Sequence, residues 1–201
     1  MEIWATIDTE TTGLPDQDWS RVIELAAVLR DGEGNILRTY DTFVCPDVLT
    51  AEGLDVAKRI SNISESDIRA GKDIKEVWRE LGDFLDGWTY PVRAWNTEFD
   101  QALLRKTFRD RNLPDQINWG GCIMWDFTRK RQFEAGFRRN GAIRPFSLKR
   151  AAGLLKFEWE GNPHRAMTDT LMASKIDHHM ASLHATPLPE VGVIRIGDIA
   201  S

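Results

Sequence analysis

The sequence predicts an α/β domain with a mixed central sheet flanked by helices. Apolar segments with strand character come first along the chain, and helical patterns then alternate with short apolar runs, an order typical of this class. A chain of 201 residues is most simply one domain with a buried core. We expect this domain over residues 1–183, followed by a C-terminal tail, 184–201, that is only partly ordered because it contains prolines and lacks periodicity.

Three strands are expected before the first long helix. Residues 2–8 carry apolar side chains without helical spacing, which indicates a buried strand. RVIELAAVLR (21–30) predicts a second strand, and the alternating ILRTYDTFV (36–44) predicts a third. The turn-rich DGEGN (31–35) between them predicts an antiparallel hairpin.

Helical spacing is clearest in DIKEVWRELGDFLDGW (73–88), where apolar side chains recur on one face. Further helices are expected at 97–112, at 146–157 with Ser147 as its cap, and at 168–183, and short strands at 91–95 and 121–126.

The composition, 42% hydrophobic and 28% charged, is that of an ordinary soluble globular protein. No apolar run approaches the ~20 residues that a membrane span needs. The first residues lack a basic lead before an apolar stretch, so no export signal is expected. The two cysteines, Cys45 and Cys122, lack the spacing of zinc ligands and are too few for a disulfide framework. This predicts reduced thiols in a cytoplasmic protein.

Positive charge is concentrated in residues 129–150, which hold eight Lys or Arg and one acid, for a local net charge of +7. Because the whole chain carries −5, the other 179 residues carry −12. Such a segregated basic block suits contact with a phosphate backbone. A solvated helix face and loop explains this block equally well when it is considered alone.

The stretch TIDTETTGL places Asp8 and Glu10 two positions apart at the end of the first predicted strand. Their side chains point to the same side because side chains alternate across a strand. Two ionised carboxylates that close repel each other unless a cation lies between them, and no Lys or Arg occurs in residues 1–19. Mg²⁺ or Mn²⁺ would remove this conflict. An isolated D-x-E is more often a solvated strand end.

Three residues further along the chain fit the same kind of site. Asp100, in AWNTEFDQALLR, falls near the start of a predicted helix, where an acid alone would simply complement the helix dipole. His164 and Asp169, in NPHRAMTDTLMA, would lie about 140° apart on one regular helix. We therefore expect His164 on a loop and Asp169 at the start of the helix. By itself, His164 would be an ordinary surface histidine.

Together, IDTETTGL, WNTEFDQALLR and HRAMTD match in order and approximate spacing the three motifs of the DEDD exonuclease superfamily. The H-x-x-x-x-D form of the third motif resembles the DEDDh branch, which includes the proofreading epsilon subunits of bacterial DNA polymerase III, and the first motif is most similar to that group. The resemblance covers roughly residues 3–180 and implies a ribonuclease H-like fold. Family members often have His before the Asn of the second motif, where this chain has Trp95, which we expect in the core.

The resemblance implies a 3′–5′ exonuclease that hydrolyses single-stranded DNA, or frayed 3′ ends, to nucleoside 5′-monophosphates with two divalent cations, Mg²⁺ or Mn²⁺. Asp8, Glu10 and Asp169 would hold one cation. Asp8 would be shared with the second, which Asp100 would ligate directly or through water. His164 would act as the general base, because imidazole exchanges its proton near neutral pH.

The resemblance also places Thr11, Thr12 and Leu14 on one side of a pocket for the terminal nucleotide, with Asn96 and Phe99 on the other. An apolar side chain such as Leu14 or Phe99 can stack on bases without reading sequence. Either residue could instead belong to the core.

Two other functions fit the same residues. One is an exoribonuclease or oligonucleotide-degrading nuclease, since nothing clearly separates ribose from deoxyribose preference. The other is a non-catalytic polymerase accessory module, which the loss of any of the five motif residues would favour, and all five are present. The expected partners are single-stranded nucleic acid, with DNA favoured, and a polymerase or replication protein in trans; no membrane is expected.

Overall fold

Six strands form one mixed sheet in the order β4-β3-β2-β1-β5-β6 in the computed structural model, which describes residues 2–185. The strands are β1 (Ile3–Thr11), β2 (Val22–Asp31), β3 (Ile36–Cys45), β4 (Lys72–Asp73), β5 (Val92–Ala94) and β6 (Trp119–Cys122). β1 is central: it pairs antiparallel with β2 and parallel with β5. β2 and β3 form the predicted antiparallel hairpin, and the predicted mixed α/β class is confirmed.

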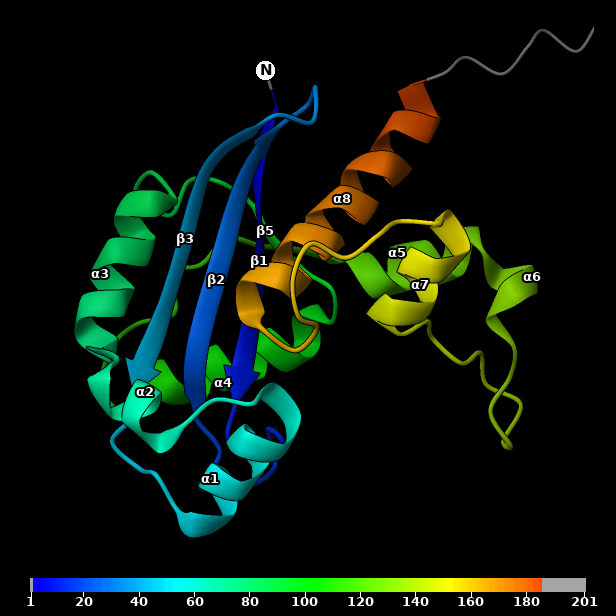
Figure 1. The fold of residues 1–201 in the computed structure, drawn as a ribbon. Helices are drawn as coiled ribbons and strands as arrows, with labels where there is room; N and C mark the ends of the chain where they lie inside the picture. The colour runs from blue at the N-terminus through cyan, green and yellow to red at the C-terminus, as the bar shows by residue number, and fades with distance from the viewer. Residues whose placement is uncertain (1, 186–201) are drawn as a thin grey trace, which may run out of the picture.

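Helices cover both faces of this sheet (Figure 1). They are α1 (Ala51–Val56), the short π-helical η1 (Ala57–Ser61), α2 (Glu65–Ala70), α3 (Ile74–Phe84), α4 (Thr97–Arg109), α5 (Ile123–Lys130), α6 (Gln132–Ala135), α7 (Leu148–Leu155) and α8 (Ala166–Ala185). α3 and α4 pack on one face, and α8 crosses β1 and β2 on the other. Among these helices, none is long and apolar enough to cross a membrane. The predicted tail lies outside the described residues from 186 onward.

Side chains alternate between the two faces of the sheet along β1 and β2, and this alternation decides which of them face α8. Ile7 of β1 and Leu25 of β2 are fully buried in the main core cluster together with side chains of α3 and α4. Their neighbours along each strand therefore point to the opposite face. Asp8 and Glu10 lie on that α8 side, and Glu10 is directly across from Glu24 of β2.

A second core cluster joins α5, α7 and α8 beside the sheet. Trp95 directly follows β5 and is buried in this cluster, as expected. The rings of Phe127 and Phe146 meet edge to face with centroids 5.1 Å apart. Ser147 caps α7, as predicted, because its hydroxyl accepts a hydrogen bond from the backbone N–H of Arg150.

The predicted strand at 121–126 is wrong over most of its length. β6 ends at Cys122, and α5 begins at Ile123. Ile123 and Phe127, about one helical turn apart, are both buried, which stabilises a helix. An apolar run this short fits either a strand or a helix by its pattern alone.

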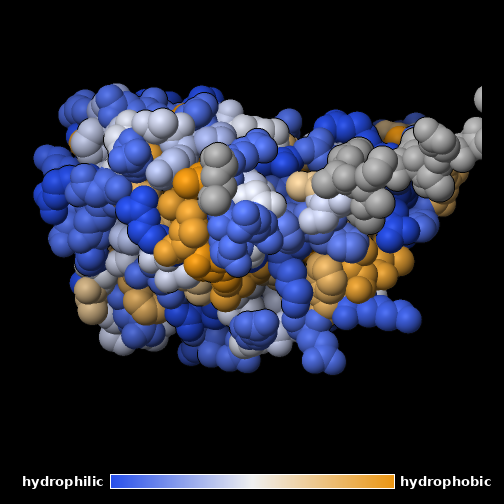
Figure 2. Space-filling view, turned by 90° about the horizontal axis from the view of Figure 1, so that it is seen from above, coloured by the Kyte–Doolittle hydropathy of each residue, from blue (hydrophilic) through white to orange (hydrophobic). Residues whose placement is uncertain are grey.

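Figure 2 shows the end of the molecule opposite to the one where β1 finishes. Hydrophilic side chains dominate this face, and hydrophobic atoms gather in two separate areas, one over the central strands and one on the side of α5 to α7. The acidic residues of interest lie at the other end, where β1 reaches its carboxyl terminus.

Candidate active site

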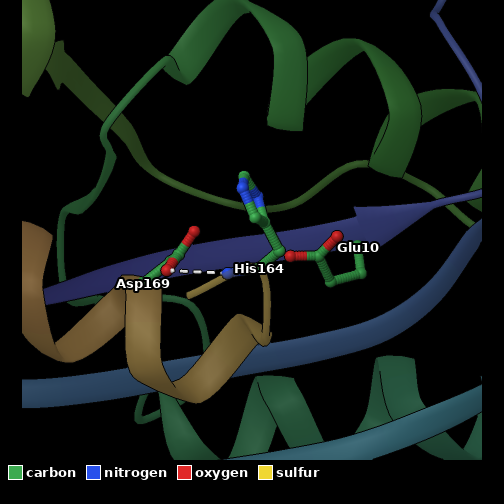
Figure 3. A group of neighbouring side chains, drawn as sticks. All are labelled: Glu10, His164 and Asp169. Carbon is green, nitrogen blue, oxygen red and sulfur yellow. Dashed lines mark hydrogen bonds between the residues drawn. The ribbon is translucent and has the colours of Figure 1, made fainter. Parts of the chain in front are cut away.

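The predicted acidic residues come together at the carboxyl end of β1. Asp8 and Glu10 end this strand, Asp100 lies in the first turn of α4, and Asp169 lies in the first turn of α8. Ligand atoms of Glu10, His164 and Asp169 all lie within 4.8 Å of one another. Figure 3 shows Glu10 and Asp169 on either side of His164. Segments separated by more than 150 positions in the sequence thus meet at one strand end.

Thr9 orients Asp100 from the opposite face of β1. Its side chain points away from Asp8 and Glu10, toward α4, because neighbouring strand residues alternate. Both its backbone N–H, at 3.0 Å, and its hydroxyl, at 2.8 Å, donate to Oδ1 of Asp100. The second carboxylate oxygen of Asp100 stays available for another partner. One strand therefore supplies two acids from one face and fixes a third from the other.

Glu10 is held by η1. The hydroxyl of Ser61, the last residue of η1, donates to Oε2 of Glu10. Asn62 follows with a left-handed backbone, which ends the helical segment and closes the turn. Both Glu10 and Ser61 are buried, so this contact fixes the carboxylate without solvent competition.

His164 lies on the loop before α8, as expected. Its φ of +64° is in the left-handed region, an uncommon conformation for a residue other than glycine. The side chain is exposed, and the backbone N–H donates to Oδ1 of Asp169 at 3.3 Å. The loop therefore carries an accessible imidazole while its backbone is tied to the carboxylate of the helix. α8 begins at Ala166, two residues before the predicted start.

Glu24 anchors the start of α8 to the sheet. Arg165 donates to it from Nη2, at 2.6 Å, and from Nε, at 3.1 Å. The backbone N–H of Ala166 donates to Oε2 of Glu24 at 3.0 Å, which satisfies one of the unpaired donors at the helix start. Glu24 is 2% exposed and lies directly across from Glu10, where two unpaired acids would repel. Arg165 offsets that repulsion, and the pair fixes the segment between His164 and Asp169.

Burial raises the pKa of Asp8, Glu10, Asp100 and Asp169, and the charges of neighbouring acids add to this effect for Asp8, Glu10 and Asp169. Burial, followed by the charges of Asp100, Glu10 and Asp169, raises the pKa of Asp8 well above its ordinary value. Burial raises the pKa of Glu10 to about 7 against the opposing hydrogen bond from Ser61, and raises the pKa of Asp100 to about 7. It raises the pKa of Asp169 to about 6. Crowded carboxylate oxygens beside one imidazole fit a hard divalent cation, whose charge would remove the repulsion.

A cavity of about 450 Å³ opens beside Glu10. Its lining residues are Thr9, Glu10, Thr11, Gly13, Leu14, Gln17, Val56, Arg59, Ile60 and Phe99. Leu14 is 56% exposed, which is not the environment of a core residue. The cavity thus has apolar walls from three separate segments and an acidic side at Glu10. Its volume is that of a small-molecule site.

Two of the predicted pocket residues do not line this cavity. Thr12 is buried beneath the loop, where its hydroxyl accepts the backbone N–H of Arg21 at 2.7 Å. Asn96 precedes α4, and its carbonyl oxygen accepts the N–H groups of Phe99 and Asp100. Both residues shape the elements that carry the site without facing the cavity.

Other residues at the site carry no motif that would have identified them. Ser61, Ile60 and Arg59 belong to η1, in the unremarkable stretch AKRIS. Glu24 offered a signal, because it is an acid within the otherwise apolar strand RVIELAAV, and a buried acid needs a partner.

The comparison with protein families identifies the class of the chain. The family model described as Exonuclease (RNase_T) matches residues 5–176. The chain therefore belongs to this exonuclease family, which confirms the prediction of an exonuclease. A search among curated proteins finds no match.

Several solved structures with the same fold are nucleases. The nuclease domain of 3′hExo, a DEDDh family member solved with rAMP, has a TM-score of 0.70 at 16% identity, and the match covers 90% of this chain and 92% of that one. Cell-death related nuclease 4 (CRN-4) has a TM-score of 0.68 at 17% identity, covering 91% of this chain and 64% of that one. E. coli Exonuclease I, solved with a dA13 oligonucleotide, has a TM-score of 0.67 at 15% identity, and the match covers 90% of this chain and 41% of that one. The chain thus spans less than two thirds of the length of CRN-4 and of Exonuclease I. These matches in fold confirm the expected ribonuclease H-like mixed sheet.

Proposed function

We propose that the protein is a metal-dependent 3′–5′ exonuclease that hydrolyses single-stranded DNA, or frayed 3′ ends, to nucleoside 5′-monophosphates. The observation that carries the proposal is the cluster of Glu10, His164 and Asp169 within 4.8 Å, in a member of the exonuclease family. The cluster lies among further carboxylates and beside a cavity that could take one nucleotide. Solved 3′-exonucleases with the same fold support the direction of hydrolysis.

The carboxylates would hold two divalent cations, Mg²⁺ or Mn²⁺. Asp8, Glu10 and Asp169 would bind one, Asp8 would be shared with the second, and Asp100 would complete the second. When bound, such cations stabilise the attacking and leaving oxygens of an in-line displacement at phosphorus. Thr9 and Ser61 position Asp100 and Glu10 for this role.

His164 would act as the general base. The oxygen of water attacks phosphorus, the bond from phosphorus to the 3′ oxygen breaks, and His164 takes the proton that the water loses. Its exposed imidazole, on a loop tied to Asp169, supports this role because the ring can reach solvent while the backbone stays fixed. The released 3′ oxygen takes up a proton from solvent.

The terminal nucleotide would occupy the cavity beside Glu10. Leu14 and Phe99, which both line it, would stack on the last base, and Thr11 would contact the sugar or phosphate. Apolar walls of this kind bind every base, since each base has a flat face. The enzyme would therefore remove nucleotides with little sequence preference.

The nature of the sugar is the part of the proposal that most needs a direct test. The neighbours in the fold were solved with rAMP in one case and with a deoxyadenosine oligonucleotide in another. The first motif favours DNA. An exoribonuclease is therefore the second candidate.

The test compares 5′-labelled single-stranded DNA, duplex DNA and RNA, each with Mg²⁺, with Mn²⁺ and with chelator. We expect a ladder of progressively shorter single-stranded DNA with either cation and none with chelator. The same strand labelled at its 3′ end should release labelled mononucleotide from the start. Asp8→Asn should be inactive, and Asp83→Asn, an exposed carboxylate on α3, serves as the matched control. Faster hydrolysis of RNA would replace the DNA proposal, and internal cleavage would exclude an exonuclease.

A further inference from the structure

The segment between α5 and α7 projects from the body of the molecule. We call residues 131–145 the basic arm; they comprise α6 and a hairpin-like loop. The two halves of the loop are joined by the bridge between Phe137 and Ile143 and by the hydrogen bond from Arg138 N–H to Ala142 O at 2.8 Å. Figure 1 shows that the tip of the arm points toward the same end of the molecule as the carboxyl end of β1.

The base of the arm is fixed to α7. Arg150 donates to the carbonyl oxygens of Glu134 and Ala135, and its guanidinium lies 4.3 Å from the ring centroid of buried Phe146. Ala135 is 1% exposed, and Ile143 packs against the second core cluster. The arm is therefore held on the body at both ends rather than joined to it by a free linker.

Two phenylalanines of the arm face solvent. Phe133 is 96% exposed and Phe137 is 72% exposed. The chain has nine phenylalanines, all within the described residues, and the other seven are at least partly buried. Two large apolar rings left in water on one short segment are a feature expected of a surface that is covered in a complex.

The same segment exposes cations without acidic partners. Arg138, Arg139 and Arg144 are all exposed. Within residues 2–185, no carboxylate lies within 4.0 Å of any of them. By contrast, Arg129 and Arg131 at the base are paired with Asp126 and Glu134. The free positive charge is thus placed beside the two exposed rings.

Exposed aromatic rings interleaved with free arginines match the chemistry of a single-stranded nucleic acid. Arginines bind its phosphates, and unpaired bases stack on aromatic rings, whereas the bases of a duplex are already stacked on one another. An acidic protein would pair with the arginines, but it would need two suitably placed aromatic side chains to stack on both rings, whereas every base of a strand offers a flat face. The charge of +7 on residues 129–150 against −12 on the rest directs a polyanion to this side of the molecule.

We infer that the basic arm is a second binding site for the strand being degraded, upstream of the nucleotide in the cavity, with Phe133 and Phe137 stacking on its bases. The inference rests on the proposed nuclease function. It adds that the protein favours strands long enough to reach from the cavity to the arm over very short oligonucleotides.

The test is the ratio of kcat/KM on a strand of about 30 nucleotides to kcat/KM on a dinucleotide, chosen because one site covers about 4–16 nucleotides. Phe133→Ala combined with Phe137→Ala should lower this ratio about tenfold or more, since each lost stack weakens binding several-fold. Leu37→Ala, an exposed apolar residue on β3, is the matched control and should keep the ratio of the wild type. Turnover of the dinucleotide by each variant shows that its active site is folded.

Salt dependence tests the arginines independently. Replacing Arg138, Arg139 and Arg144 by Ala should flatten the slope of log Kd against log salt for the long strand by about 2, because each phosphate contact contributes about 0.7. Lys75→Ala combined with Arg79→Ala, two exposed cations on α3, should leave the slope unchanged.

The outcomes separate the two proposals. A wild type that hydrolyses neither substrate contradicts the nuclease function itself. A wild type that hydrolyses both, with arm variants that keep its ratio and its slope, overturns the arm proposal alone. If the arm variants lose as much affinity for duplex as for single strands, contact with phosphates alone explains the arm. If they change the oligomeric state and keep the ratio, the arm serves self-association. Either result overturns the arm proposal.

Discussion

His164 shows how a single residue can be accessible and yet fixed. Its imidazole is exposed, while its left-handed backbone donates to Asp169, and Arg165 next to it is bound to Glu24. The imidazole, the proposed proton acceptor, is thus free to move only through rotation of its side chain. A general base held in this way gains orientation at little cost in reach.

His164→Ala tests the role of the imidazole. We expect kcat to fall by about a hundredfold to ten-thousandfold, the usual contribution of a general base, while binding of Mn²⁺ and of the strand is kept. Single-turnover kinetics and a separate titration of Mn²⁺ would measure the two quantities. Equal turnover of variant and wild type under saturating Mn²⁺ would remove His164 from the mechanism. Loss of Mn²⁺ binding would instead make it a ligand.

Glu24→Gln tests whether the hydrogen bonds from Arg165 and Ala166 to Glu24 position the site. The amide keeps the shape but loses the charge that faces Arg165, so we expect the free energy of unfolding to fall by about 1–3 kcal/mol. We also expect a lower kcat with little change in KM, because the segment from His164 to Asp169 is less well fixed. Denaturant titration and steady-state kinetics measure both. Glu33→Gln, an exposed acid in the β2–β3 turn, is the control. A loss of stability with unchanged kcat would limit Glu24 to a structural role.

At the scale of elements, the sequence motifs indicated that β1, α4 and α8 contribute to the site, because each carries an acid within a recognisable motif. η1 has no such mark, yet it supplies Ser61 to Glu10 and Ile60 to the cavity. Its contribution depends on a tertiary contact between segments 51 positions apart, which no local pattern encodes. The prediction of a strand at residues 121–126 was wrong for a different reason, because a short apolar run does not distinguish a strand from a helix.

Ser61→Ala tests the contribution of η1. The hydroxyl lowers the pKa of Glu10, so its removal should raise that pKa further and leave more of the carboxyl protonated near neutral pH. We therefore expect a severalfold higher Mn²⁺ concentration for half-maximal activity at pH about 7, and a smaller difference at pH about 9, where the carboxyl ionises in both proteins. Ser66→Ala on α2 is the control. An unchanged Mn²⁺ requirement at neutral pH would contradict this role for Ser61.

At the scale of the whole molecule, the sequence was sufficient for the class, the hairpin and the main helices, because these depend on periodicity. The five motif residues were predicted from the resemblance of their three motifs to a known family, and the structure shows how distant elements bring Glu10, His164 and Asp169 together. It could not be predicted that Thr12 and Asn96 would lie away from the cavity, because each depends on a backbone contact formed only in the folded loop. The exposure of Phe133 and Phe137 likewise follows from tertiary packing.

The stability of the whole chain should depend on pH and metal together. The pKa values of Glu10 and Asp100, about 7 in the folded protein, lie above the value of about 4 expected in the unfolded chain. The folded state therefore binds more protons, and metal-free protein loses stability as pH rises from about 4 to about 7. Mn²⁺ replaces these protons, so we expect it to raise Tm more at pH about 8 than at pH about 5. A shift that is larger at the acidic pH would contradict this linkage.

The central claim, that Asp8, Glu10, Asp100 and Asp169 form one site for a pair of cations, is tested most directly by calorimetric titration of the protein with Mn²⁺. We expect two ions per chain for the wild type and for Asp83→Asn, and at most one weakly bound ion for Asp8→Asn, because Asp8 would serve both. Absence of binding to the wild type, or equal binding to Asp8→Asn, would contradict the claim.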